Sequence, residues 1–442
     1  MGYKVSMVSL GCPKNQVDAE QMLYTLKKAG FELGVPEAEA DAIIINTCGF
    51  IEDAKSEAIE NIIEAAQYKN ERGLPKIIVT GCLAERYRDD VTAEIPEADV
   101  CVGIGANGDI AKIVRRAIEG KCENCYGKKD DLDLNSPRIL GGYPFTAYIK
   151  VADGCDNRCT YCAIPEIRGR LRSRKIEDIV AEAKSLANKG VRELIVVAQD
   201  TTAYGTDIYG EPRLAQLLRE LCKIEKLHWI RTLYTYPDKI TDELIDTIKS
   251  ENKLVKYLDI PLQHINNDIL RKMNRKGRRE DIEALICRLR AEIPEIALRT
   301  TFITGFPFET DKEFTELHEF IKETRFDRLG CFAYSEEENT PAAEFDCQVE
   351  KQVRLDRADA IMADQMTIAA EKNNDKIGKT LEVLIEGWDD YIKCYFGRTQ
   401  FDAPEIDGKI FFSSEKPLVL GGFVSVEVTD SIEYDLLGEA IL

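Results

Sequence analysis

Short apolar runs alternate with longer amphipathic stretches over the first 120 residues of the chain. The apolar runs are rich in β-branched residues and occupy positions 3–10, 41–47, 76–81 and 98–103. Stretches with apolar residues every three or four positions follow the first two runs, at about 18–29 and 50–67. Strands that alternate with helices in this way are typical of a parallel sheet covered on both faces. We therefore predict an N-terminal α/β domain over residues 1–120.

A second alternating series begins at Tyr143 and ends in a long helical pattern. Its predicted strands occupy 147–152, 193–198, 229–234, 256–261, 297–303 and 328–335. Helical patterns lie between most of these strands, and six such repeats predict an incomplete or open α/β barrel. The helix expected at 350–373 leads out of this barrel. We assign the domain to residues 143–372.

Two further segments complete the predicted organisation. Residues 121–142 are polar and charged with little periodicity, which is typical of a linker. From about Lys376, apolar and polar residues alternate between Gly-rich turns, which predicts a small β-barrel over residues 373–442. The expected fold is therefore a multidomain α/β protein, with a parallel-sheet α/β domain, a partial β/α barrel and a C-terminal β-barrel.

The charge of the chain narrows the class of partner. The 442 residues carry a formal net charge of −20, whereas phosphate binding depends on Lys and Arg. A basic partner is therefore favoured over a broad nucleic-acid footprint. No window of about 18 apolar residues is present, and the first residues lack the features of a signal peptide. We expect a cytoplasmic protein that does not enter a membrane.

Cysteine is the residue type most informative about chemistry. Fourteen cysteines in a cytosolic chain favour metal or redox chemistry over structural disulfides. With only three histidines, a metal site must be built mostly of sulfur, which suits iron–sulfur clusters or zinc. Cys12, Cys48 and Cys82 directly follow the first three predicted strands. Ligands of parallel sheets bind beyond the carboxyl ends of the strands, so we expect these thiols to share one crevice.

A second group of thiols follows the first predicted barrel strand. Cys155, Cys159 and Cys162 form a C-x-x-x-C-x-x-C pattern, and this loop lies at the face where barrels carry their active sites. Zinc normally takes four protein ligands; the nearest candidate pair is Cys122 and Cys125, upstream in the linker. Three thiolates instead match three irons of a four-iron cluster. Its fourth iron would then be open to the amino and carboxylate groups of S-adenosylmethionine.

The sequence around these thiols resembles a known family. The loop GCDNRCTYCAIPEIRGRLRSR is similar to the cluster loop of the radical SAM superfamily and, more narrowly, to that of the methylthiotransferases. The resemblance covers essentially the whole chain and implies a partial barrel between an N-terminal three-cysteine domain and a C-terminal TRAM β-barrel. The stretch SLGCPKNQVDAEQM is most similar to the RimO branch. Two positions depart from the family pattern, because Phe308 and Asn339 stand where Gly is usual.

The resemblance implies two 4Fe-4S clusters and S-adenosylmethionine as cofactors. Their implied ligands are two groups of three cysteines: Cys12, Cys48 and Cys82, and Cys155, Cys159 and Cys162. The resemblance implies that the cluster on Cys155, Cys159 and Cys162 cleaves S-adenosylmethionine to a radical that abstracts hydrogen. The other cluster is implied to supply sulfur. Tyr161 is expected near the adenine, and Gln199 and Asp200 near the methionine moiety. The alternative role of Tyr161 is that of a packed aromatic ring. The alternative for Gln199 and Asp200 is hydrogen bonding within their loop.

The implied substrate is an aspartate of the small-subunit ribosomal protein numbered twelve, free or on the ribosome. The implied reductant is an electron donor such as flavodoxin or ferredoxin. One rival function is a transfer-RNA adenosine methylthiotransferase, and another is a non-catalytic iron–sulfur protein for electron transfer or RNA binding. Residues 375–442 hold 6 Lys and Arg against 14 Asp and Glu, which favours a basic protein over transfer RNA.

Three features have local interpretations. Arg168, Arg170, Arg172 and Arg174 are expected to form a solvated charged face, with carboxylate binding as the alternative. His264 ends a predicted strand and is expected to be a structural histidine with satisfied hydrogen bonds. The pair Cys122 and Cys125 receives no role.

Overall fold

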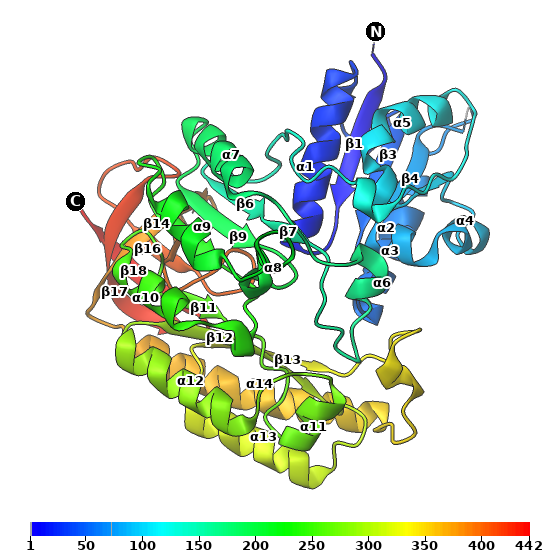
Figure 1. Ribbon diagram of the computed structural model, residues 1–442. Helices are drawn as coiled ribbons and strands as arrows, with labels where there is room; N and C mark the ends of the chain where they lie inside the picture. Colours follow the sequence, from blue (N-terminus) through cyan, green and yellow to red (C-terminus); the bar gives the residue numbers. More distant parts are fainter. Residues whose placement is uncertain (1, 72) are drawn as a thin grey trace.

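Five strands form a parallel sheet in the N-terminal part of the chain, in the order β2-β1-β3-β4-β5 (Figure 1). The structure is a computed structural model that describes residues 2–71 and 73–442. The strands are β1 (Lys4–Ser9), β2 (Glu32–Leu33), β3 (Ala42–Thr47), β4 (Lys76–Gly81) and β5 (Val100–Val102). Four of them confirm the sequence prediction. The two-residue strand β2 was not predicted, because it is too short to show a pattern.

Helices cover both faces of this sheet, as predicted. They are α1 (Pro13–Lys28), α2 (Glu52–Ala66), α3 (Cys82–Tyr87), α4 (Asp89–Glu94) and α5 (Ile110–Ile118), with 3-10 turns η1 (Glu37–Glu39), η2 (Ile104–Asp109) and η3 (Lys129–Asp131). Met22 of α1 and Ile113 of α5 belong to one apolar core, and Ile62 of α2 belongs to a second core on the other face. Helix α1 begins five residues before the predicted start at Asp18. Pro13 fits the first turn, where no N–H is needed.

Six parallel strands form the central open barrel, at the predicted positions. They are β6 (Thr146–Lys150), β9 (Glu193–Val197), β10 (Trp229–Thr232), β11 (Tyr257–Asp259), β12 (Ala297–Thr304) and β13 (Arg328–Ala333). Hydrogen bonds order them as β10-β9-β6 and β11-β12-β13, and a bridge between Ile230 and Leu254 connects the two halves. Helix α1 of the N-terminal sheet contacts β6, the edge strand of this barrel (Figure 1).

Helices surround the barrel on its outer side. They are α7 (Ile176–Asn188), α9 (Leu214–Cys222), α10 (Asp242–Ser250), α12 (Arg279–Glu292), α13 (Asp311–Thr324) and the exit helix α14 (Lys351–Asn374). The loops at the carboxyl ends of the strands carry short elements, namely β7 (Ala152–Asp153), α6 (Ile164–Arg168), β8 (Arg172–Ser173), η4 (Thr201–Ala203), α8 (Thr206–Tyr209), η5 (Pro237–Lys239), α11 (Asn267–Lys272) and η6 (Pro341–Glu344). The pattern predicted at 350–373 is confirmed by α14.

Five strands close into a small barrel at the C-terminus, which confirms the predicted β-barrel. They are β14 (Thr380–Asp389), β15 (Cys394–Thr399), β16 (Ile410–Ser413), β17 (Phe423–Ile432) and β18 (Asp435–Ile441), in the order β14-β15-β16-β18-β17. Ile385, Phe412 and Val426 are among the side chains that fill its interior. None of the helices in the described residues combines the length and the apolar character needed to cross a bilayer.

The C-terminal barrel covers the starts of the central strands. Glu193, the first residue of β9, accepts hydrogen bonds from Arg231 at 3.0 Å and from Arg398 of β15 at 2.5 Å. The ring of Trp229, at the start of β10, lies 4.8 Å from that of Phe423. The carboxyl ends of the same strands, where the cysteine loop follows β6, therefore lie at the opposite end of the barrel from this contact (Figure 1).

Candidate functional site

Cys12, Cys48 and Cys82 lie at the carboxyl edge of the N-terminal sheet. The strand order changes direction between β1 and β3, and a crevice for ligands forms at such a point. Cys12 follows β1, Cys48 follows β3, and Cys82 follows β4 one strand further along. Gly11 allows the close approach: it has φ +89°, and a Cβ there would lie 2.8 Å from the Cβ of Cys48.

Asn15 fixes the loops that carry two of these thiols. Its side-chain nitrogen donates to the carbonyl of Leu10 at 2.8 Å and to that of Thr47 at 3.1 Å. These carbonyls precede Cys12 and Cys48 by two residues and one residue. Asn15 is buried, so the bonds tie the ends of β1 and β3 together away from water. The thiol positions are therefore set by a shared hydrogen-bonding centre.

The electrostatic environment differs among the three thiols. Burial alone would raise the pKa of the Cys12 thiol, but Lys14 and Arg168 outweigh this effect and hold the pKa below its ordinary value. Burial, followed by the neighbouring thiols of Cys82 and Cys12, raises the pKa of Cys48 to about 12. Burial also raises the pKa of Cys82, although Arg168 opposes the rise. Two fixed cations therefore flank this group of thiols.

The second group of thiols lines a cavity of about 310 Å³. Cys155, Cys159 and Cys162 contribute one wall, and Asn339 and Pro341, which follow β13, contribute another. Burial raises the pKa of Cys155 to about 11. Burial and the neighbouring Cys159 raise the pKa of Cys162 further above its ordinary value. The predicted C-x-x-x-C-x-x-C loop thus presents its three sulfurs to one shared space.

Backbone contacts hold this loop in place from two sides. The N–H of Thr160 donates to the carbonyl of Met273 at 3.1 Å, and the Thr160 hydroxyl donates to that of Lys272 at 2.8 Å. On the other side, the N–H of Ala342 donates to the Thr160 carbonyl at 2.9 Å. The loop is therefore clamped between the end of α11 and η6.

The three predicted cofactor-contacting residues lie beside this loop. Tyr161 packs in an apolar cluster, and its hydroxyl accepts a hydrogen bond from Arg275 at 3.2 Å. Gln199 donates to Asp153 at 2.9 Å. Asp200 is buried and accepts hydrogen bonds from Asn157 and from Lys239, both at 2.7 Å.

The donors present fit an iron–sulfur centre with a bound small molecule. The side-chain oxygen of Gln199 is buried and has no hydrogen-bond partner in the described residues, so it is free to accept one from a ligand. Among those residues, no three His, Cys, Asp or Glu side chains converge on a point that would hold a single metal ion. A cluster binds each thiolate through a different iron, so its ligands need not converge in that way.

The predicted solvated arginine face is wrong for three of its four members. The side chain of Arg172 is 19% exposed and lies 3.6 Å from a carboxylate oxygen of Asp153. The side chains of Arg168 and Arg174 are 1% and 3% exposed, whereas that of Arg170 is 76% exposed. Arg168 and Arg174 pair with Asp18 and Glu182, which are distant in sequence. Local sequence cannot reveal such partners.

The prediction for His264 is confirmed. Its side chain is fully buried, with Nε2 3.2 Å from a carboxylate oxygen of Glu309 and Nδ1 accepting from the N–H of Asn266 at 3.0 Å. Both ring nitrogens are satisfied within the protein.

Sequence reasoning missed Lys14, Asp153 and Arg275 as parts of the site. Lys14 and Asp153 are only two residues from predicted cluster ligands, which is a signal of proximity that the pattern did carry. Arg275 contacts Tyr161, which lies 114 residues earlier in the chain, and no local sequence pattern indicates that contact.

Strained backbone gathers at this end of the barrel. Six residues other than Gly have left-handed φ values in the loops that follow the strands: Arg158, Tyr234, Gln263, Asn274, Phe308 and Asn339. Phe308 has φ +73° and Asn339 has φ +62°, which explains why Gly suits the two positions that depart from the family pattern. Such strain is concentrated at functional sites in proteins.

Sequence comparisons divide the chain into three matched regions. Residues 4–103 match the uncharacterized protein family UPF0004, residues 149–321 match the radical SAM superfamily, and residues 377–441 match the TRAM domain.

Several curated relatives resemble the chain over its full length. A protein of Desulforamulus reducens is 50% identical over 440 residues, covering 98% of this chain and 99% of the relative. One of Pelotomaculum thermopropionicum is 51% identical over 446 residues and covers 100% of both chains. A third, of Clostridioides difficile, is 48% identical and covers 99% of both. All three are named ribosomal protein uS12 methylthiotransferase RimO.

Solved structures share the fold at low sequence identity. The radical S-adenosylmethionine methyltransferase TsrM of Kitasatospora setae, solved with cobalamin and a 4Fe-4S cluster, matches 77% of this chain and 77% of its own, with a TM-score of 0.56 and 16% identity. The cobalamin-dependent radical enzyme OxsB matches 83% of this chain and 58% of its own, with a TM-score of 0.51 and 14% identity.

Proposed function

The chain belongs to the RimO family of ribosomal protein uS12 methylthiotransferases, and we propose from this premise that it inserts a methylthio group at the β-carbon of an aspartate of uS12. The observation that carries the proposal is the presence of two separate groups of three thiols, one on the N-terminal sheet and one on the barrel loop. Each group fits three irons of a four-iron cluster.

We propose that Cys155, Cys159 and Cys162 hold one cluster and that the N-terminal thiols hold the other. When bound, these clusters and S-adenosylmethionine supply one-electron cleavage of the sulfonium, a radical that abstracts hydrogen, and the sulfur atom. The protein contributes orientation and a site closed to water. Neither side-chain acids nor bases can readily break an unactivated C–H bond, which is why the cofactors are needed.

The residues beside the barrel loop then position S-adenosylmethionine. The free side-chain oxygen of Gln199 is available to accept a hydrogen bond from the amino group of the methionine moiety. Asp153 fixes the amide of Gln199, and Lys239 fixes Asp200 beside it. Arg275 anchors the Tyr161 hydroxyl, so that the aromatic ring is held for contact with the adenine.

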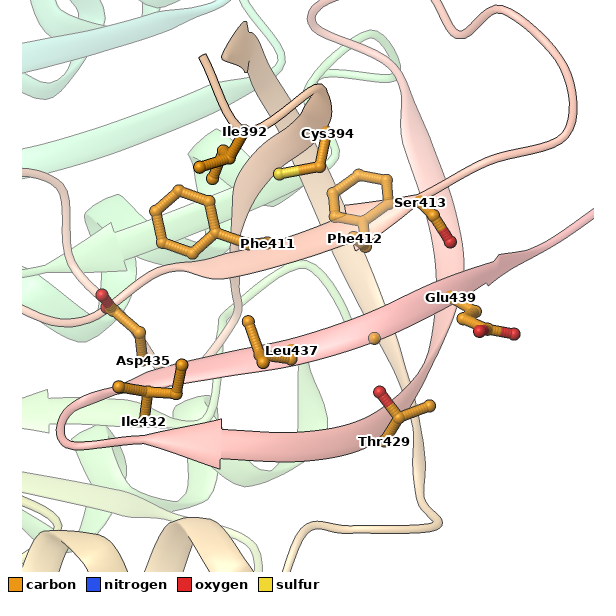
Figure 2. A pocket seen from close by; sticks show the side chains of 11 residues that line it. Ile392, Cys394, Phe411, Phe412, Ser413, Thr429, Ile432, Asp435, Leu437 and Glu439 are labelled. Carbon is orange, nitrogen blue, oxygen red and sulfur yellow. The ribbon is translucent and has the colours of Figure 1, made fainter. Parts of the chain in front are cut away.

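The C-terminal barrel suits a basic protein substrate. A groove of about 370 Å³ crosses its surface, and Figure 2 shows Ile392, Phe411 and Leu437 facing into it. Asp435 and Glu439 stand at its rim (Figure 2). Residues 375–442 carry 14 acidic and 6 basic residues, so the surroundings are also acidic. We propose that the groove holds a Lys- and Arg-rich segment of uS12 through one apolar side chain, with the rim binding its charges.

The test is the modification itself. Anaerobically reconstituted protein, incubated with uS12, S-adenosylmethionine, a sulfide source and dithionite, is expected to add the mass of a methylthio group to one aspartate, as measured by mass spectrometry of uS12 peptides. The same modification is expected to be missing from uS12 of a strain lacking the gene. If that strain retains methylthio-aspartate and instead loses a methylthiolated adenosine from its transfer RNA, the proposal is wrong.

Three further parts of the proposal concern the cell compartment, the electron donor and the state in which uS12 is modified. We infer that the reaction takes place in the cytoplasm, where ribosomal proteins are made, and that a flavodoxin or ferredoxin supplies the electron. Incubation of the protein with free uS12 and with intact small subunits distinguishes whether the substrate is modified before or after assembly.

A further inference from the structure

A single short helix connects the two groups of thiols. Helix α6 begins two residues after Cys162, and it packs against α3, which begins at Cys82. Ala163 and Ile167 from the α6 segment join Cys82 and Ile104 in one buried apolar cluster. The loop of one proposed cluster and a ligand of the other therefore share a wall.

Arg168, the last residue of α6, crosses this wall. Its side chain is 1% exposed. Nη1 lies 2.5 Å from a carboxylate oxygen of Asp18 and 3.4 Å from one of Asp153. Nη2 donates instead to the side-chain oxygen of Asn15 at 3.2 Å and to the sulfur of Cys82 at 3.5 Å. One edge of the guanidinium thus binds carboxylates, and the other edge faces a thiol.

The carboxylates alone do not account for this arrangement. Lys150 is also buried and pairs with Asp18, and its nitrogen lies 3.6 Å from Asp153. Arg172 also lies 3.6 Å from Asp153, so three cations surround the two buried carboxylates of this network. The Nη2 edge is left to polar groups of the N-terminal sheet, and Asn15 is the residue that fixes the loops before Cys12 and Cys48.

We propose that Arg168 is a positioning residue that fixes the separation of the two clusters and raises the reduction potential of the N-terminal one. A hydrogen bond to a ligand sulfur and a buried positive charge both favour the more negative, reduced state of a cluster. Sulfur delivery and hydrogen abstraction must act on the same carbon, so their sites need a fixed spacing. This inference rests on the function proposed above.

The experiment compares Arg168→Met and Arg168→Lys in the full-length chain. Met keeps the length of the side chain without its charge, and Lys keeps the charge without the second N–H edge. Arg219→Met is the matched control, because Arg219, on α9, pairs with Glu243 in an exposed ion pair. The potential of the N-terminal cluster is measured by redox titration monitored by electron paramagnetic resonance, in chains whose Cys155, Cys159 and Cys162 are replaced by Ala.

The potential is expected to fall in Arg168→Met, to fall less in Arg168→Lys, and to stay unchanged in Arg219→Met. In the holoenzyme, Arg168→Lys is expected to keep forming 5′-deoxyadenosine while the methylthio product per 5′-deoxyadenosine falls several-fold. If the potential is unchanged in both variants, or if product and 5′-deoxyadenosine fall in proportion, the inference is overturned. Should Arg168→Met not fold, Arg168→Lys alone decides between these outcomes.

Failure of the inference is distinguishable from failure of the proposed function. The potential is measured without any substrate, so it reports on Arg168 even if the wild-type protein does not modify uS12. Conversely, wild-type activity on uS12 with unchanged potentials in the variants would leave the function intact and remove the role of Arg168.

Discussion

The side-chain nitrogen of Lys14 lies 3.3 Å from the centre of the Tyr234 ring. Lys14 belongs to α1 of the N-terminal sheet, and Tyr234 follows β10 of the central barrel in a left-handed conformation with φ +62°. Lys14 is 7% exposed and forms no ion pair with a carboxylate among the described residues. A buried cation next to Cys12 that lacks a carboxylate is well placed to face an anionic cluster.

This relationship predicts that Lys14→Met weakens iron binding. Burial alone would lower the pKa of Lys14, but Cys12 and Tyr234 outweigh this effect and hold the pKa above its ordinary value. The charged side chain of Lys14 is therefore stabilised where it lies, beside Cys12. In the loaded protein the cluster loses its neighbouring cation, and iron is expected to be lost to a chelator several times faster. Lys28→Met, at an exposed position of the same helix, serves as the control. Unchanged iron retention in Lys14→Met would contradict this account.

The two groups of thiols are expected to bind iron independently. Replacing Cys12, Cys48 and Cys82 together by Ala is expected to leave about half of the iron and sulfide of the reconstituted protein, measured by chemical analysis. Replacing Cys155, Cys159 and Cys162 is expected to remove the other half and to abolish cleavage of S-adenosylmethionine. Full iron content after either replacement would show that other side chains bind the metal.

The left-handed backbone of Phe308 predicts an unusual order of stability among variants at this position. Its φ of +73° costs a residue with a Cβ roughly 1 kcal/mol that Gly does not incur. Its ring also lies 5.7 Å from that of Phe345, so both Phe308→Gly and Phe308→Ala lose an aromatic contact. Only the Ala variant keeps the strain. The free energy of unfolding is expected to be about 1 kcal/mol higher for Gly than for Ala, by denaturant titration. The opposite order would show that the backbone relaxes in the variants.

The environment of Glu193 predicts that the free energy of unfolding falls in acid. Burial alone would raise the pKa of Glu193, but Arg398 and Arg231 outweigh it and hold the pKa below the ordinary value of 4.5. A carboxylate with a depressed folded pKa contributes stability that is fully present above 4.5 and is lost as the pH falls through the folded value. Glu193→Gln is expected to destabilise the protein by about 3 kcal/mol at neutral pH, because two buried arginines lose a partner. Its unfolding free energy is then expected to fall less steeply below pH 4.5 than that of the wild type. Parallel curves in acid would assign the dependence to other carboxylates.

Glu439 tests the groove of the C-terminal barrel. Glu439→Lys reverses one charge at the rim and is expected to lower kcat/KM for uS12 several-fold at low salt, with a smaller difference at high salt. Formation of 5′-deoxyadenosine without uS12 is expected to be unchanged, because the groove lies at the opposite end of the central barrel from Cys155, Cys159 and Cys162. Glu319→Lys, on the exposed side of α13, makes the same change of charge elsewhere and serves as the control. Equal kcat/KM values for the two variants would exclude the groove as the binding surface.

The elements of this fold were predictable where a local pattern specifies them. Strands β3, β4 and β9 contain continuous apolar runs, which a buried parallel sheet requires. Strands such as β1 and β12 mix apolar with polar residues, but their β-branched residues and their place between helical patterns still mark them. The two residues of β2 pair with Lys4 and Val5, and their strand conformation depends on that pairing alone. The start of α1 was placed too late, since the capping position at Cys12 carries no capping side chain to mark it.

The site was predictable in its thiols and not in their surroundings. Cys12, Cys48 and Cys82 could be brought together because the topology of a parallel sheet fixes where its loops meet. The burial of Arg168 depends on Asp18, 150 residues earlier in the chain, and on Cys82, 86 residues earlier. Such contacts arise from the packing of the N-terminal sheet against the barrel, and no periodicity within either segment specifies them.

The C-terminal barrel sits at the starts of the central strands, whereas the thiols lie beyond their ends. The strand β12 has 8 residues, which at a rise of about 3.3 Å each amounts to roughly 26 Å. Under the binding mode proposed here, the segment of uS12 held in the groove and the target aspartate must be at least this far apart. A partner in which the two lie closer together would bind without being modified, so selectivity would depend on distance as well as on composition.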